Sequence, residues 1–292
     1  MSIKKSSEKA VVKDCGTLYM VATPIGNLGD ISPRAVETLN AVELIAAEDT
    51  RHSQRLLSHL GVATHMQAYH EHNEEYQAER LVARLQQGDS IALISDAGTP
   101  LVSDPGYRLV EQAHQHGIKV VPIPGPCAAI SAMSVAGLAT DRFSFEGFPP
   151  AKQAARLGNL GLLKEETRTM VFYISCHRIL ETLKDMRTVF GEKRLATFAR
   201  EVTKTYETIR KATLDELCEW VAGDDMQRKG EIVLVVAGSV KDKSAHPLRD
   251  EILAVLVDEL PVKQAAKIAS RITGINKNEL YEAALKLKNK DD

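Results

Sequence analysis

Hydrophobic residues in the first half of the chain fall into short apolar runs that alternate with amphipathic stretches of helical period. Four runs have the length of buried strands, and we expect these strands at residues 18–23, 43–48, 91–95 and 119–125. The stretches between them predict helices at residues 32–42, 51–61, 74–88 and 105–117. Strands and helices in this alternation predict a parallel α/β sheet.

Residues at the expected helix ends support these boundaries. Ser32 stands before Pro33, which is the order expected of an N-cap followed by proline at the first helical position. Gly61 and Gly88 are expected to close the second and third helices. By the same rule we expect Asp104 to be an N-cap, with Pro105 opening the next helix.

The order of elements changes from about residue 126. A helix of small residues is expected at 127–137, and four further strands at 142–150, 169–175, 194–201 and 231–238. Helices are expected around residues 151–166, 178–190 and 213–222. This part of the chain predicts a second domain of mixed α/β type.

The last fifty residues are helical, and their later part, residues 261–290, is basic. Two helices separated by a turn at Gly274, the second starting near Asn276, have the shape of a helix-turn-helix. Residues 261–290 hold seven Lys and Arg but two Glu, a net charge of +5. This extension is expected either to contact RNA or to pack on the core. We therefore predict a flexible tail at 1–15, domains at 16–125 and 126–240, and a helical extension at 248–292, with a linker at 239–247.

Composition narrows the possible environments of the protein. The 292 residues carry a net charge of −2, so any attraction to nucleic acid must come from a local basic face. The cysteines form no C-x-x-C pair, which argues against a zinc site or a disulfide framework and favours a reduced, cytoplasmic protein. They are Cys15, Cys127, Cys176 and Cys218. The start of the chain has lysines but no apolar signal region, and no run approaches the length of a membrane span.

Three expected strands end in loops rich in Gly and Pro, at residues 23–30, 95–106 and 122–129. Because the carboxyl ends of parallel strands meet at one edge, these loops predict a ligand pocket. The first loop lacks the G-x-G-x-x-G of dinucleotide binders, and no G-x-x-x-x-G-K-[ST] of a P-loop occurs. Only one aspartate, Asp96, directly follows its strand, which weakens an aspartyl-phosphate reading. A lysine-free loop suits a ligand held by backbone groups, such as a sulfonium cofactor.

Polar clusters follow other expected strand ends. Glu48, Asp49, Arg51 and His52 follow one strand and form either a solvated turn or a wall facing the substrate. His70 and His72 resemble a metal pair, but no further His or Cys has zinc spacing, so we predict no metal. Substrate contact, or helix capping by Asn73, is the better interpretation. Arg178, Arg200 and Lys204 follow later strands and form either a phosphodiester clamp or surface ion pairs.

Several segments together resemble the ribosomal RNA small subunit methyltransferase I family of the tetrapyrrole methylase superfamily. They are ATPIGNLGDIS, LIAAEDTRHS, YHEHNE, ALISDAGTPLVSDPGYRLV, PIPGPCAAISAMSVAGL, DRFSFEGFPPAK and FAREVTKTYET. The resemblance covers residues 16 to 290. It implies an α/β fold of two tetrapyrrole-methylase domains with a small C-terminal helical extension, a homodimer, and S-adenosylmethionine as cofactor. The implied substrate is 16S rRNA, or the 30S subunit, methylated on the ribose 2′-oxygen of a decoding-site cytidine, with no membrane partner.

The resemblance also implies a set of cofactor-binding positions. They are Pro24, Ile25, Asp96, Gly98, Thr99, Pro100, Val102, Cys127, Ala128, Ile174 and Ala237. Asp96 is expected to bind backbone amides rather than to react. The family usually has glutamate where this chain has Ile174, so a carboxylate is missing from that position.

Methylation of a ribose hydroxyl needs a group that accepts the hydroxyl proton. The candidates for this catalytic role are Glu48, Asp49, His70 and His72. The RNA would be held by Arg51, Arg178, Arg200, Lys204, Lys263, Lys267, Arg271 and Lys277. Two alternatives remain open: a methyltransferase acting on a tetrapyrrole or a protein side chain, and a non-catalytic factor that binds rRNA.

Overall fold

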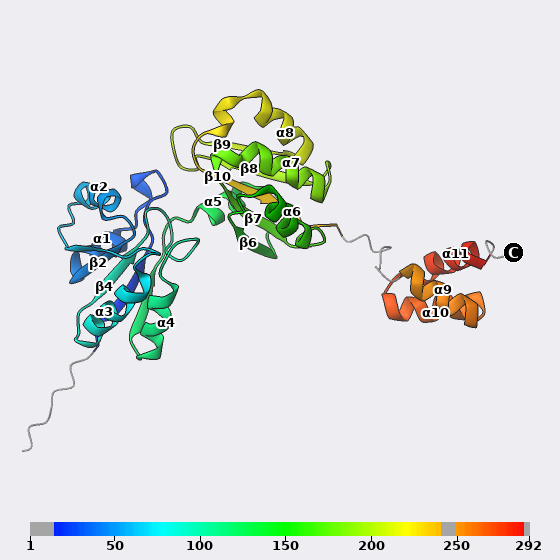
Figure 1. The fold of residues 1–292 in the computed structure, drawn as a ribbon, viewed down its shortest axis with the longest axis horizontal. Helices are drawn as coiled ribbons and strands as arrows, with labels where there is room; N and C mark the ends of the chain where they lie inside the picture. The colour runs from blue at the N-terminus through cyan, green and yellow to red at the C-terminus, as the bar shows by residue number, and fades with distance from the viewer. Residues whose placement is uncertain (1–14, 241–248, 289–292) are drawn as a thin grey trace, which may run out of the picture. The chain divides into compact units, whose positions relative to one another are not determined.

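The computed structural model describes residues 15–240 and 249–288 and divides them into two compact units (Figure 1). The first unit ends at Ala237 and holds both sheets, while the second begins at Gly238 and also takes in residues 165–167. The tail predicted at 1–15 lies, apart from Cys15, outside the described residues, as does most of the linker predicted at 239–247.

The first sheet is parallel throughout, as predicted, with strand order β3-β2-β4-β1-β5. Its strands are β1 (Thr17–Val21), β2 (Leu44–Ala47), β3 (Met66–Ala68), β4 (Ile91–Ile94) and β5 (Lys119–Ile123). Its helices are α1 (Pro33–Ala41), α2 (Thr50–Leu60), α3 (Glu74–Gln86) and α4 (Tyr107–Gln115). All four residues of β2 and of β4 are buried, because helices cover both faces of the sheet. The sequence pattern did not predict β3, which is three residues long.

Local hydrogen bonds explain which helix ends were predicted correctly. The Ser32 hydroxyl accepts from the backbone N–H of Ala35 at 3.1 Å, which confirms it as the N-cap of α1. Gly61 ends α2 in the left-handed conformation, at φ 68°. The prediction for Asp104 was wrong, because α4 begins at Tyr107 with Gly106 as its N-cap. A φ of 136° at Gly106 keeps the Asp104–Pro105 segment outside the helix.

The second sheet is mixed, as predicted, with strand order β6-β7-β10-β8-β9. Strand β6 runs parallel to β7 and the remaining neighbours are antiparallel. Its strands are β6 (Phe143–Gly147), β7 (Thr169–Ile174), β8 (Leu195–Arg200), β9 (Thr208–Thr213) and β10 (Ile232–Val236). Its helices are α5 (Ala128–Val135), α6 (Gln153–Leu162), α7 (Ile179–Phe190) and α8 (Leu214–Gly223). Strand β9 was not predicted.

A buried ion pair fixes the segment that leaves β6. Arg156 on α6 donates to Asp185 on α7 at 2.7 Å, and both side chains are almost fully buried. The same guanidinium donates to the carbonyl oxygens of Pro150 and Ala151. Since three acceptors surround one buried cation, the segment carrying Phe148 is held against the body of the second sheet.

The second unit has its own small core. Its helices are α9 (Arg249–Glu259), α10 (Val262–Thr273) and α11 (Lys277–Lys288). Residues from all three helices share the core, among them Leu253, Ala266 and Leu280. Gly274 ends α10 at φ 72°, so the predicted helix, Gly274 turn and second helix are confirmed. Within residues 15–240 and 249–288, every helix falls short of the length and apolar character needed to cross a bilayer.

Candidate functional site

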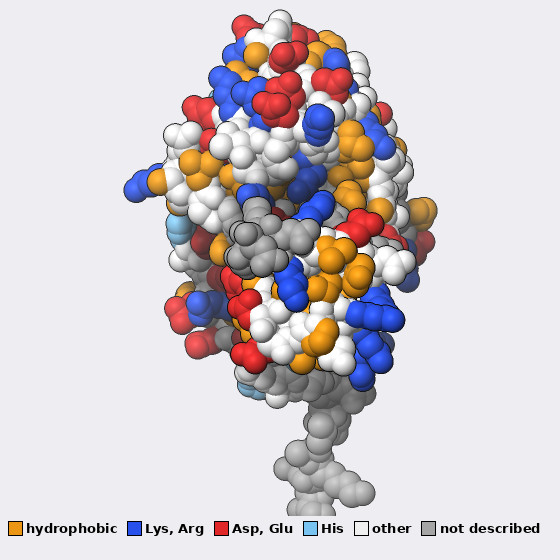
Figure 2. All heavy atoms as spheres, turned by 90° about the vertical axis from the view of Figure 1, so that its right-hand side faces the viewer, with side chains coloured by type: hydrophobic (Ala, Val, Ile, Leu, Met, Phe, Trp, Pro, Cys, Tyr) orange, Lys and Arg blue, Asp and Glu red, His pale blue; other side chains and the backbone are white. Residues whose placement is uncertain are grey.

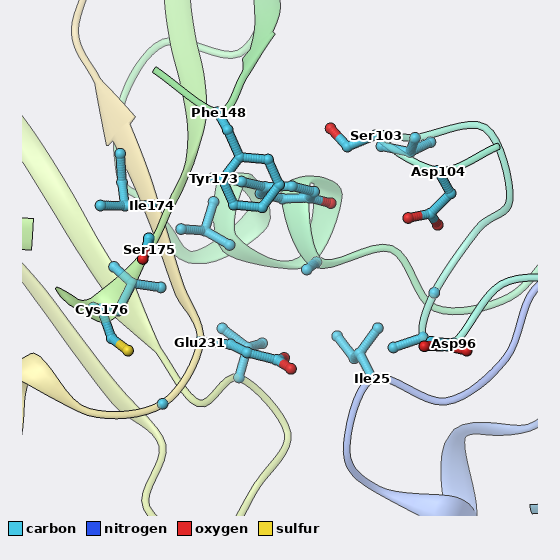
Figure 3. A pocket seen from close by; sticks show the side chains of 18 of the residues that line it. Ile25, Asp96, Ser103, Asp104, Phe148, Tyr173, Ile174, Ser175, Cys176 and Glu231 are labelled. Atoms are coloured by element: carbon cyan, nitrogen blue, oxygen red, sulfur yellow. The ribbon is translucent and has the colours of Figure 1, made fainter. Parts of the chain in front are cut away.

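A pocket of about 540 Å³ opens at the carboxyl ends of the first sheet's strands (Figure 3). Loops after β1, β2 and β4 form one wall, and the end of β7 and the start of β10 form the other. The predicted site residues in its lining are Ile25, Glu48, Asp96, Gly98, Thr99, Val102, Ala128 and Ile174. The pocket therefore lies at the sheet edge where the three Gly/Pro-rich loops predicted it.

Backbone hydrogen bonds bring those loops together. Thr23 and Gly98 exchange two bonds, with N–H to O distances of 2.8 and 3.1 Å. The Thr99 hydroxyl donates to the carbonyl of Pro126 at 3.0 Å, which ties the β4 loop to the loop after β5. Gly98 has φ +86°, and a Cβ on it would lie 3.3 Å from the Ile25 side chain. Glycine is thus required there both by backbone conformation and by the close approach of Ile25.

Four carboxylates line the pocket: Glu48, Asp96, Asp104 and Glu231. Among the described lining residues there is no Lys or Arg. Burial raises the pKa of Glu48, and burial together with the charges of Glu48 and Asp96 raises the pKa of Asp104 to about 6. A pocket with this lining favours a ligand that carries positive charge.

Two of these carboxylates join the ends of β2 and β4. The backbone N–H of Asp49 donates to Asp96 Oδ1 at 3.0 Å, and the backbone N–H of Asp96 donates to Glu48 Oε2 at 3.4 Å. Asp96 therefore binds a backbone amide, as the sequence predicted. The pair of bonds fixes the edge of the sheet on which the pocket is built.

The four candidate catalytic residues occupy different environments. Only Glu48 lines the pocket. Asp49 is the N-cap of α2, and hydrogen bonds from the backbone N–H groups of Arg51 and His52 help to lower its pKa. His70 lies close enough for its charge to influence Glu48, whereas His72 is exposed and contacts the His70 ring edge-on at 6.0 Å.

Asn73 holds the His70 segment rather than capping α3 with its side chain. Its side-chain oxygen accepts from the backbone N–H of His70 at 2.9 Å, and its amide donates to the carbonyl of Ala68 at 3.2 Å. Asn73 occupies the N-cap position of α3 but makes no side-chain capping bond. Its role here is to close the turn between β3 and α3.

The remaining cofactor positions lie beside the pocket or far from it. Pro24, Pro100 and Cys127 are chain neighbours of lining residues but are not part of the lining. The structure does not bring Ala237 to the pocket. β10 contributes its first residues to the lining, while Ala237 follows its other end and donates its N–H to the carbonyl of Leu195.

The predicted phosphate-binding residues of the first unit divide into two groups. Arg200 is 6% exposed and donates to Tyr206 O, Thr208 Oγ1 and Lys229 O, so it holds the β8–β9 turn instead of facing solvent. Lys204 pairs with Glu201 at 2.9 Å and with Glu231 at 3.0 Å. Arg51 has a 92% exposed side chain, and Arg178 is partly exposed in the short 3₁₀ turn after β7.

Sequence reasoning missed several lining residues of the second sheet. Phe148 and Tyr173 stand edge to face with ring centroids 5.5 Å apart, and both reach the pocket (Figure 3). Glu231 reaches the pocket from the start of β10. On the first-sheet side, Asp104 also lines the pocket, although the sequence predicted it to be a helix cap. Phe148 and Tyr173 lie near the ends of the strands expected at 142–150 and 169–175, which is the signal that could have identified them.

The second unit presents the basic residues that the sequence predicted there. Lys263, Lys267 and Arg271 are exposed at four-residue spacing, so they form one stripe along α10. Lys277 opens α11 and is also exposed. Exposed Ile268 follows Lys267 in the chain. Figure 2 shows Lys and Arg side chains beside hydrophobic ones on the face that it presents.

Two family models match the chain. One, described as Tetrapyrrole (Corrin/Porphyrin) Methylases, matches residues 17–218. The other, described as RsmI C-terminal HTH domain, matches residues 249–288, the three helices of the second unit. Together they cover both units of the structure.

Relatives of high identity carry one name. Ribosomal RNA small subunit methyltransferase I of Pseudomonas aeruginosa is 55% identical over 278 residues, which is 94% of this chain and 99% of the relative. The protein of the same name from Escherichia coli O157:H7 is 54% identical over 273 residues, 92% of this chain and 95% of the relative. Both matches span nearly the whole of each protein.

Solved structures share the fold at low identity. Diphthine synthase matches with a TM-score of 0.57 and 15% identity over 76% of this chain and 90% of that one. Uroporphyrin-III-C-methyltransferase from Thermus thermophilus matches with a TM-score of 0.55 and 19% identity over 76% of this chain and 94% of that one. These likenesses support the fold.

Proposed function

Because the chain belongs to the tetrapyrrole methylase family and to its ribosomal RNA small subunit methyltransferase I branch, we propose that it methylates 16S rRNA using S-adenosylmethionine. The acceptor atom is the ribose 2′-oxygen of a decoding-site cytidine. The observation that carries the proposal is 55% identity to a protein of that name across 99% of its length. The chemistry of the pocket supports it independently.

The residues of the pocket fit this cofactor. A volume of about 540 Å³ lies within the range of roughly 300–1,000 Å³ that holds ligands of such size. The carboxylates of the lining, without Lys or Arg, suit a sulfonium and an ammonium group. Ile25, Gly98 and Thr99 would hold the cofactor from the first sheet, and Ala128 and Ile174 from the other side. When bound, S-adenosylmethionine supplies a methyl group activated by positively charged sulfur.

The protein's own contribution is alignment and exclusion of water. The bonds that join Asp49, Asp96 and Glu48 keep the strand ends fixed, so the lining needs little rearrangement when it is filled. The rings of Phe148 and Tyr173 cover an apolar part of the pocket. A ribose hydroxyl is a poor acid, so a carboxylate of the lining must accept its proton as the new bond forms.

The RNA must be held mainly by groups outside this acidic pocket. Arg51 after β2 and Arg178 after β7 are exposed or partly exposed cations that could contact the RNA, and the α10 stripe adds Lys263, Lys267 and Arg271. The target nucleotide must leave its stack to bring its 2′-hydroxyl into the pocket.

We also propose that the protein is a homodimer in the cytoplasm. Phe143 and Phe145 are exposed on β6, which is an edge strand of the second sheet. Contact with a second copy would remove this apolar surface from water. Sedimentation equilibrium of the full chain tests it, since a monomer at all concentrations contradicts the dimer.

Methyl-labelled S-adenosylmethionine tests the function directly. The full chain is incubated with 30S subunits, with free 16S rRNA and with a porphyrinoid, and each acceptor is then isolated. Label in the 30S subunit or in free 16S rRNA is expected. Label in the porphyrinoid would favour a tetrapyrrole methyltransferase, and cofactor binding without any labelled product would favour a non-catalytic rRNA-binding factor.

A further inference from the structure

Three carboxylates stand together at the first-sheet wall of the pocket, and they are bonded differently. Glu48 and Asp96 each accept a backbone N–H from the other's strand end. No bond from a strand-end N–H to Asp104 occurs among the described residues; burial raises the pKa of Asp104, and the nearby Ser95 hydroxyl opposes that rise. Two of the three are therefore engaged in holding the strands, and one is available for chemistry.

We propose that Asp104 is the catalytic base that takes the proton from the attacking ribose hydroxyl. The proposal rests on the proposed function, because it needs an RNA hydroxyl as the acceptor of the methyl group. It goes beyond the candidates that the sequence indicated, of which only Glu48 lines the pocket.

The loop that presents Asp104 has an unusual backbone. Leu101 and Ser103 adopt left-handed conformations, at φ 72° and 70°, although neither is glycine. Such a conformation is unfavourable for a residue with a side chain and persists only where the surroundings impose it. The surroundings here are the core of the first sheet, since a Cβ on Gly106 would lie 2.7 Å from both Leu101 and Leu93. Leu101 packs against this core, and the three residues that follow it line the pocket.

Asp104 faces the second-sheet wall across the pocket (Figure 3). Burial is the main cause of the raised pKa of Tyr173 on β7, and the charge of Asp104 adds to it, so the two side chains lie within electrostatic reach of each other. His177 and Glu231 line the same wall, and Glu48 and Asp96 stand on Asp104's own side. Asp104 is therefore exposed to the space between the walls, where both cofactor and acceptor must meet.

The environment also gives Asp104 a suitable basicity. Burial is the largest cause of its raised pKa of about 6, followed in the same direction by the charges of Glu48 and Asp96. A base with a pKa near the working pH is ionised at neutral pH and still accepts a proton in the transition state. Glu48 shares the burial, but its bond from the Asp96 N–H favours its charged form.

The step balances without any further reactant. The ribose oxygen forms a bond to the methyl carbon as the bond from that carbon to sulfur breaks, and the electron pair stays on sulfur. The hydroxyl proton passes to a carboxylate oxygen of Asp104. It then leaves to solvent, which restores the ionised carboxylate for the next turnover.

The test compares full-length Asp104→Asn and Asp104→Glu with the wild type, with Asp141→Asn as an exposed control. Calorimetry measures S-adenosylmethionine binding, and single-turnover transfer to 16S rRNA or the 30S subunit is followed from pH 5 to 9 at saturating cofactor. We expect Asp104→Asn to bind the cofactor within about threefold of the wild type and to transfer about 10²–10⁴-fold more slowly. The wild-type rate should rise through about pH 6, the Asn variant should lack this rise, and the Glu variant should regain part of the rate.

Two results would overturn the inference alone. One is an Asp104→Asn variant that transfers at the wild-type rate with an unchanged pH profile. The other is a variant whose loss is fully explained by weaker cofactor binding, which would make Asp104 a group that holds the cofactor. If the wild type itself labels no RNA, the proposed function fails, and that outcome is distinct from either of these.

Discussion

The pocket and residues 261–290 of the second unit carry opposite charge. The pocket lining has four carboxylates and, among the described residues, no Lys or Arg, whereas residues 261–290 have a net charge of +5. The first environment suits a sulfonium and repels phosphate, and the second attracts phosphate. A protein that joins a cationic donor to a polyanionic acceptor benefits from keeping the two attractions on separate surfaces.

The difference also explains why cations close to the pocket are engaged by other groups. Lys204 is paired with Glu201 and Glu231, and Arg200 is bonded to backbone carbonyls. The charge of Lys204 is balanced by its two carboxylate partners, whereas Arg200 keeps its charge but is held by the β8–β9 turn and does not line the pocket. Variants of the pocket or of the α10 stripe separate the two roles when cofactor binding and RNA binding are both measured.

The largest effect is expected from placing a side chain at Gly98 in the pocket lining. Gly98→Val places a branched side chain at φ +86° against Ile25, and we expect S-adenosylmethionine affinity to fall at least about 100-fold. Gly117→Val is the matched control, because Gly117 also has positive φ but has open space around it. Equal loss of cofactor binding in both variants would contradict a local role for Gly98. Calorimetry measures the affinity, and RNA binding should be unchanged in both.

The next effect is expected from neutralising the α10 stripe. Replacing Lys263, Lys267 and Arg271 together by Ala should weaken 16S rRNA binding by about 10–100-fold near 0.15 M salt and reduce the salt slope by about 2–3. Cofactor affinity should not change. Replacing Lys184 and Lys193, which are exposed on the first unit, should leave RNA binding nearly unaltered. Filter binding across salt concentrations measures the slope, and an unchanged slope in the triple variant contradicts the RNA role of the stripe.

A smaller effect is expected at Asp96, where charge and geometry can be separated. Asp96→Ala leaves the backbone N–H of Asp49 without its acceptor, and the free energy of unfolding should fall by about 1–3 kcal/mol. Asp96→Asn keeps an acceptor oxygen and should retain most of the stability, but it removes one negative charge and should weaken cofactor binding. Denaturant unfolding and calorimetry give the two quantities. If both variants lose the same stability, the bond to Asp49 is not what Asp96 contributes.

The smallest effect concerns stability as a function of pH. The pKa of Asp104 is raised above its ordinary 3.8 to about 6, so the folded protein disfavours the ionised carboxylate. Above pH 6 that carboxylate is charged, and Asp104→Asn should therefore stabilise the fold by about 1–2 kcal/mol, a value reduced from the full shift because the group is only half buried. The gain should shrink as the pH falls from 6 towards 3.8, and it should vanish only well below 3.8, where the wild-type side chain is neutral in both states. Thermal unfolding at pH 4 and pH 7.5 measures it, and a gain equal at both values would contradict the linkage.

The sequence predicted most of the first sheet because four of its strands are short, mainly apolar runs separated by amphipathic helices. The cap at Ser32 was correct because it depends on a bond to Ala35, three residues away. The cap at Asp104 was wrong because Gly106, at φ 136°, keeps the Asp104–Pro105 segment outside the helix, so that α4 begins at Tyr107. Strand β9 was missed because its residues are half or fully exposed and lack an apolar run.

The site was predictable where it depends on loops and unpredictable where it depends on pairing between distant strands. Gly98 and Thr99 could be predicted as pocket residues because they lie in one loop rich in Gly and Pro, at residues 95–106. Arg200 resembles a phosphate ligand in the sequence, and only the fold shows that carbonyls of the neighbouring turn and loop surround it. Ala237, predicted to bind the cofactor, lies away from the pocket for a similar reason. Strand β10 runs antiparallel to β7, so Ala237 follows the end of β10 that is opposite the pocket.

Alkaline hydrolysis of 16S rRNA after a single turnover tests the central claim most directly, because it reports both the acceptor and the atom. A 2′-O-methyl group blocks cleavage of the next phosphodiester bond, so the label should appear in one alkali-resistant dinucleotide that begins with cytidine. Label in an ordinary mononucleotide would place the methyl group on a base and contradict the account, and label recovered outside the RNA would contradict it entirely.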